Sequence, residues 1–175
     1  MTKEIRTLHN KIEVDLDENY EFTIAKSIIP DYKMCSLISE WIHTNLTNLT
    51  DDNDNKLFNK VNYGYNEDTL KTFGKKPTCD VYVDNIDYDE DITESRPLTA
   101  HSIIIFYVKG ANDAAYIKTC QIHDYIMQQF IENPNWKELD NIVRNTVITN
   151  SQVMNQTINK KWGVMGAFEL EHQLY

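Results

Sequence analysis

The densest group of potentially reactive side chains is a run of carboxylates between residues 80 and 94. Clustered carboxylates can hold Mg²⁺, as they do in nuclease sites, so one hypothesis is a metal-dependent nuclease that uses Asp80 and Asp84. Such sites usually hold their carboxylates on rigid strands beside a Lys or His, whereas most of this run follows a predicted strand. The sequence therefore favours a solvated acidic loop, whose residues are Asp84, Asp87, Asp89, Glu90, Asp91 and Glu94.

Other possible metal sites fail on spacing. Cys120 and His123 are three residues apart on a predicted helix, but no second Cys/His pair completes a tetrahedral zinc site, so structural roles are favoured. The Asp-rich loop that starts at Asp51 has Lys56 and Asn62 where a calcium-binding loop needs Gly and Glu. Gly-rich phosphate loops and a nucleophile elbow are also absent from the sequence. We therefore expect no metal, no cofactor and no catalytic activity.

Charge and composition narrow the class of protein further. The net charge of −10 argues against a nucleic-acid-binding surface, because phosphate neutralisation needs clustered Lys and Arg. The three cysteines are far apart and form no disulfide framework, which favours a reduced, cytosolic setting. The charged N-terminus is not typical of a signal peptide, and no apolar run approaches the ~20 residues of a membrane helix.

Hydrophobic periodicity predicts the elements that position these side chains. Residues 11–26 alternate between apolar and polar types, which indicates an N-terminal β-hairpin. Residues 102–108 are apolar throughout, as expected of a central strand covered on both faces. Residues 149–161 are polar and are predicted to form a loop or a β-excursion. The remaining predictions are helix 31–49, strands 57–66 and 78–86, helix 111–133, strand 142–148 and terminal strand 164–174.

This pattern predicts an α+β fold. A single mixed or antiparallel sheet is packed by the two main helices, 31–49 and 111–133, and the N-terminal β-hairpin is an extension. Residues 1–28 would form a hairpin arm, and residues 29–175 the α+β domain.

The order of elements resembles the tail terminator and tail-completion, or head–tail joining, proteins of long-tailed bacteriophages. The resemblance covers roughly residues 31–175. It is carried by four segments, which are Pro77–Val83, the strand Ser102–Val108 with the helix after it, Leu139–Ile148 and Gly163–His172. The N-terminal hairpin departs from the compact members of that family.

The resemblance implies a structural virion protein, assembled in the host cytoplasm. It would form a ring, typically a homohexamer, that ends the tail tube and joins it to the neck. Its partners would be other copies of itself, the tube protein and the neck or connector proteins. DNA would pass without specific binding, and the acidic loop would face the lumen or a partner. The alternative is a cytosolic protein-binding adaptor. The candidate inter-subunit edges are Ile12, Val14, Tyr20, Phe22, Phe168 and Leu170.

Overall fold

The computed structural model divides the chain into two compact units, Met1–Ser36 and Leu37–Tyr175, which are described separately. The unit boundary falls inside helix α1, Pro30–Asn48. The structure describes residues 5–8, 12–16, 22–24, 30–51, 53–64, 77–88, 97–110, 112–158 and 161–175.

The first unit contains a small antiparallel sheet. Strand β2, Ile12–Leu16, pairs with β3, Phe22–Ile24, which matches the predicted hairpin. A further strand, β1, Ile5–Leu8, pairs with the other side of β2. Its four residues were too few to reveal a strand by alternation. Because β2 is the central strand, Ile12 and Val14 do not lie on a sheet edge as predicted, whereas Phe22 lies on the edge strand β3. Tyr20 falls outside the described residues.

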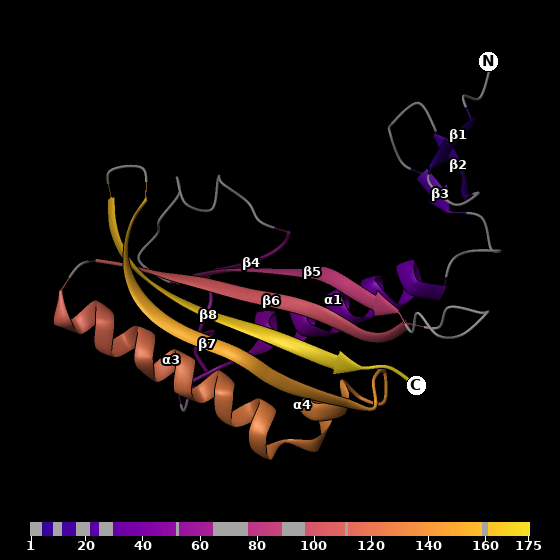
Figure 1. Cartoon of the computed structure of the whole chain (residues 1–175). Helices are drawn as coiled ribbons and strands as arrows, with labels where there is room; N and C mark the ends of the chain where they lie inside the picture. Colours follow the sequence, from indigo (N-terminus) through magenta and orange to yellow (C-terminus); the bar gives the residue numbers. More distant parts are fainter. Residues whose placement is uncertain are drawn as a thin grey trace. The chain divides into compact units, whose positions relative to one another are not determined.

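The second unit is built on one mixed five-stranded sheet, which confirms the predicted α+β fold class (Figure 1). Its strand order is β4-β5-β6-β8-β7, with β4 and β5 parallel and every other pair antiparallel. The strands are β4 Lys60–Tyr63, β5 Thr78–Tyr88, β6 Pro97–Lys109, β7 Asn145–Ile158 and β8 Lys161–Gln173.

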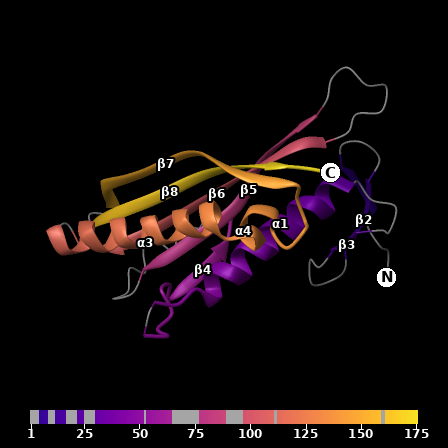
Figure 2. The same cartoon turned by 90° about the horizontal axis from the view of Figure 1, so that it is seen from below.

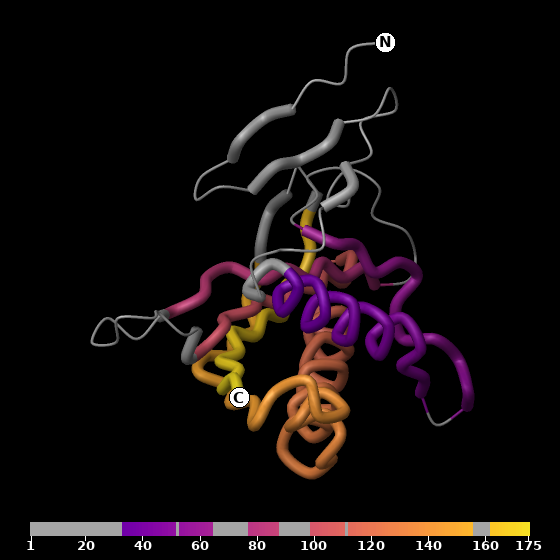
Figure 3. The backbone as a smooth tube through the Cα atoms, turned by 90° about the vertical axis from the view of Figure 1, so that its right-hand side faces the viewer, coloured from indigo at the N-terminus to yellow at the C-terminus, as the bar shows by residue number. Residues whose placement is uncertain are grey.

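The helices of this unit lie along one face of the sheet (Figure 2). Helix α3, Asp113–Glu132, begins where the side chain of Asn112 accepts a hydrogen bond from the backbone N–H of Ala115. The chain then passes through the short helix α4, Pro134–Glu138, and returns to β7 (Figure 3). Trp136 of α4 makes edge-to-face contacts with Trp41 of α1 and Phe130 of α3, so three helices meet at one aromatic cluster.

Alternate residues of β6 and β8 divide between two faces of the sheet. On the side that we call the helix face, Ile104 and Phe168 pair across the strands and are fully buried, and Phe168 stacks on His123 of α3. On the opposite side, the open face, Tyr107 and Met165 are buried but Ile103 and Ile105 are only half-buried. The expectation that β6 is fully covered on both sides therefore holds for the helix face alone.

The structure decides two predictions about the end of the chain. Strand β7 continues to Ile158, so of the loop and the β-excursion predicted for residues 149–161 the β-excursion is confirmed as far as Ile158; an edge strand with exposed side chains does not need apolar residues. Strand β8 lies between β6 and β7, so it is not an edge strand. Phe168 and Leu170 on β8 are fully buried, which removes them as inter-subunit edge residues.

Candidate functional site

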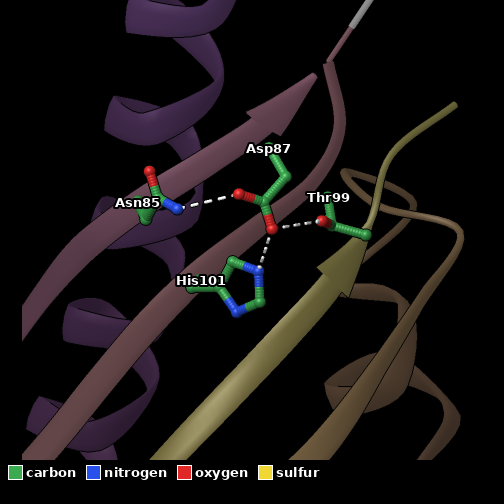
Figure 4. A network of polar contacts seen from close by, with 4 residues as sticks. All are labelled: Asn85, Asp87, Thr99 and His101. Carbon is green, nitrogen blue, oxygen red and sulfur yellow. Dashed lines mark hydrogen bonds and ion pairs between the residues drawn. The ribbon is translucent and has the colours of Figure 1, made fainter. Parts of the chain in front are cut away.

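A polar network lies on the open face, where β5 and β6 run side by side (Figure 4). The Asp87 carboxylate is its centre: Oδ2 lies 2.9 Å from Nε2 of His101, and Oδ1 accepts a hydrogen bond of 2.8 Å from the Asn85 side-chain amide. The Thr99 hydroxyl donates a longer bond of 3.5 Å to Oδ2. One of the predicted acidic residues is therefore held by three side chains from two strands.

A β-bulge at Asp84 creates this arrangement. Val83 pairs with Ser102 but Asn85 already pairs with His101, so Asp84 is the additional, unpaired residue. Before the bulge, the even-numbered residues of β5 lie on the open face. After the bulge, the odd-numbered residues lie there, so Asn85 and Asp87 are on the same side of the sheet as His101. Strict alternation along β5 would place Asp80 and Asp84 on one face of the strand, and this alternation ends at the bulge.

The network can orient an imidazole but is open to water. The Asp87 side chain is 55% exposed and that of His101 is 30% exposed, so the ion pair contributes at most about 1 kcal/mol to stability. A carboxylate beside a histidine is the orienting half of a catalytic relay, whose other half is a nucleophile or a bound water. Among the described residues, no three His, Cys, Asp or Glu side chains are placed to share a metal ion.

The acidic residues that the structure describes, Asp80, Asp84 and Asp87, do not converge on a common point. Asp80 is fully buried and accepts a hydrogen bond of 2.8 Å from Asn62, whereas Asp84 and Asp87 are exposed. Asp80 pairs with Ile105 and Asp87 pairs with Thr99, which places the two carboxylates roughly 20 Å apart along the strands. Asp84 and Asp87 lie on β5, not on the predicted loop. Asp89, Glu90, Asp91 and Glu94 fall outside the described residues.

A second polar group is buried where β6, β8 and β7 lie side by side in the sheet. His172 of β8 contacts Ser102 of β6 through Nε2 at 2.7 Å and Thr146 of β7 through Nδ1 at 2.9 Å. Burial, and secondly the charge of His101, lower the pKa of His172 to about 3. A serine–histidine contact is the start of a nucleophilic site, but His172 is fully buried and Ser102 nearly so. The group thus serves as a neutral connection between three strands.

The remaining candidate ligands pack as core residues. The His123 ring stacks on Phe168, with ring centres 4.4 Å apart, and Cys120 on the same helix is half-buried. Burial raises the pKa of the Cys79 thiol, which keeps it protonated and unreactive. These placements agree with the structural roles expected for Cys120 and His123.

Two exposed isoleucines on the outer side of α3 mark a surface that was not predicted from the sequence. Ile117 and Ile131 are 55% and 54% exposed, and they lie on the outer side of the helix with Gln121, Asp124 and Gln128. Because α3 covers the helix face of the sheet (Figure 1), this α3 outer stripe is on the opposite side of the unit from Ile103 and Ile105, which belong to the open face. A helical wheel with two stripes could have predicted it, because both isoleucines fall outside the buried stripe.

The comparisons with protein-family models and with characterised protein sequences found no match. In the part of the chain that the structure describes, no helix is long and apolar enough to cross a membrane. The function is therefore inferred from the surfaces and side chains of the molecule itself.

Proposed function

We propose that this chain is a structural assembly protein that forms a homo-oligomeric ring at the junction of a bacteriophage tail and neck. The observation that carries the proposal is a pair of unlike surfaces on the second unit, each of which presents two exposed or half-buried isoleucines. A closed ring needs two different complementary surfaces on each subunit, which is a heterologous interface. The α3 outer stripe and the half-buried isoleucines of the open face supply one surface each, on opposite sides of the unit.

The distribution of polar groups supports an assembly role. The Asp87–His101 network is exposed and the Ser102–His172 contact is buried, so neither combines a nucleophile with access to solvent. The net charge of −10 suits a DNA channel, because acidic walls repel phosphates and allow DNA to slide. In this proposal the tube protein and the neck or connector proteins bind the two ends of the ring. The protein would then act as a component of the virion.

A mixing experiment tests the ring contact directly. Ile117→Lys introduces a charge on the α3 outer stripe, and Ile103→Lys introduces one on the open face. Each variant alone should fail to form the ring, because each lacks one of the two surfaces. An equal mixture, with one variant ¹⁵N-labelled so that the two masses differ, should form heterodimers with one intact contact in excess of random pairing, measured by native mass spectrometry. Circular dichroism of each variant shows whether it is folded.

Two results would contradict the proposed ring or its assigned contact. A wild-type chain that stays monomeric and binds one partner in a one-to-one complex would favour the protein-binding adaptor. Rings that form unchanged from the Ile117→Lys variant would refute the assigned contact. Asn135→Lys gives a matched control, since it adds the same charge at an exposed polar residue of α4 outside the stripe and should leave assembly unchanged.

A further inference from the structure

Strand β7 is an edge of the five-stranded sheet, and none of the described residues pairs with its outer side (Figure 2). It is 14 residues long, whereas the opposite edge strand, β4, has four residues. A long edge strand presents a row of backbone N–H and C=O groups that can pair with another strand. From Asn145 to Asn155 the side chains of β7 are exposed or half-buried, apart from the buried Thr146.

The chemistry of β7 lacks the usual protection of an edge. No Asp, Glu, Lys, Arg, His or Pro occurs between Asn145 and Ile158, and the strand is rich in Thr, Val, Asn and Gln. Natural edge strands usually carry charges or proline, which block pairing with other chains. The one protective feature of β7 is a bulge between Ile148 and Asn150. An uninterrupted, uncharged edge remains from Asn150 to Ile158.

We propose that this edge pairs with the same strand of a second copy, antiparallel and around a twofold axis near Met154. Two chains that each carry a net charge of −10 repel one another, so a contact between copies is best made where neither copy has a charge. Each of the other long strands of the sheet contains charged residues, which leaves β7 as the uncharged long strand for such a contact. Pairing of β7 with the β7 of a second copy also covers the exposed β7 edge of both copies with one twofold interface.

The centre of the pairing follows from the uninterrupted segment. An axis at Met154 matches Asn150 of one copy with Ile158 of the other, which uses the whole stretch beyond the bulge. Met154 is 37% exposed and would meet the Met154 of the second copy directly. The contact is separate from the proposed ring, which uses the α3 outer stripe and the open face. It joins two free subunits or two rings.

Charge insertion tests the pairing in the full chain. Met154→Lys places two lysines directly opposite one another at the axis of the β7 pair, and like charges that face one another across strands disfavour pairing. In the Ile117→Lys background, which cannot form the ring, the dimer dissociation constant measured by sedimentation should rise roughly tenfold or more, a change of about 1.4 kcal/mol. Asn135→Lys adds the same charge on α4 and should leave the constant unchanged. Equal dissociation constants with and without Met154→Lys would overturn the proposal.

Cysteine crosslinking tests the register. Opposed residues in antiparallel strands place their Cβ atoms within disulfide range, so Met154→Cys should give a covalent dimer on mild oxidation. Val147→Cys is equally exposed, but its two copies would lie about 45 Å apart, and it should not crosslink above the wild-type background. Crosslinking of Val147→Cys without Met154→Cys would refute the axis. Rings that form while both β7 tests fail would refute the pairing and leave the proposed function standing.

Discussion

Acidification should destabilise the protein through His172, whose pKa in the folded chain is lowered to about 3. The unfolded chain takes up a proton near pH 6.5, the ordinary value for histidine, whereas the folded chain resists protonation because the ring is buried. Stability from this residue is therefore fully present above about pH 6.5 and is lost as the pH falls toward 3.

The size of the effect follows from proton linkage. Each pH unit between the two pKa values changes the free energy of unfolding by about 1.4 kcal/mol. At about pH 5, the loss from His172 alone is roughly 2 kcal/mol relative to neutral pH. Protonation would also force one ring nitrogen that accepts a hydrogen bond from Ser102 or Thr146 to become a donor, so the charged form loses a hydrogen bond as well as solvation.

Urea unfolding at several pH values between neutral and about pH 5 measures this loss. The His172→Gln variant should be less stable at neutral pH, but its free energy of unfolding should fall by roughly 2 kcal/mol less than that of the wild type over the same range. His101→Gln is the control, since it removes only the secondary cause of the pKa shift and should keep most of the wild-type slope. Identical slopes for His172→Gln and the wild type would refute the reasoning.

Three further variants test the packing and the site. Gly166→Ala places a Cβ against the buried ring of Phe106, so the free energy of unfolding should drop by about 1–3 kcal/mol, and the double variant with Phe106→Leu should recover part of it. Trp41→Phe removes the 2.7 Å hydrogen bond from the indole N–H to Asp140 and should cost about 1.5–3 kcal/mol in urea unfolding; an unchanged midpoint would contradict this bond. Asp87→Asn should change stability by less than about 1 kcal/mol, and a larger loss would show that the exposed network is a structural element.

The sequence predicted the elements whose side chains are sorted by burial. Helices 31–49 and 111–133 agree with α1 and α3, because their apolar stripes face the sheet and alternate with exposed polar residues. Strand β6 was also predicted, although the structure extends it in both directions to Pro97 and Lys109.

The sequence failed where pairing, and not burial, determines the structure. Strand β7 was predicted as a strand only over residues 142–148, with a loop or a β-excursion after it, because the second half of this edge strand has few apolar residues to reveal it. Strand order is decided by long-range contacts, so nothing in the local pattern of β8 showed that it would lie between two other strands. The Asp87–His101 contact depends on the bulge at Asp84, which shifts the alternation by one residue and has no signature in the sequence.

Native mass spectrometry of the purified full chain tests the central proposal most directly. We expect a closed oligomer of one discrete size with more than two copies, formed without added metal or cofactor. The Ile117→Lys and Ile103→Lys variants should each lose it, and their mixture should give a heterodimer. A wild-type chain that remains a monomer at all accessible concentrations, or a mixture that fails to associate while both variants are folded, would contradict a ring built from two unlike surfaces.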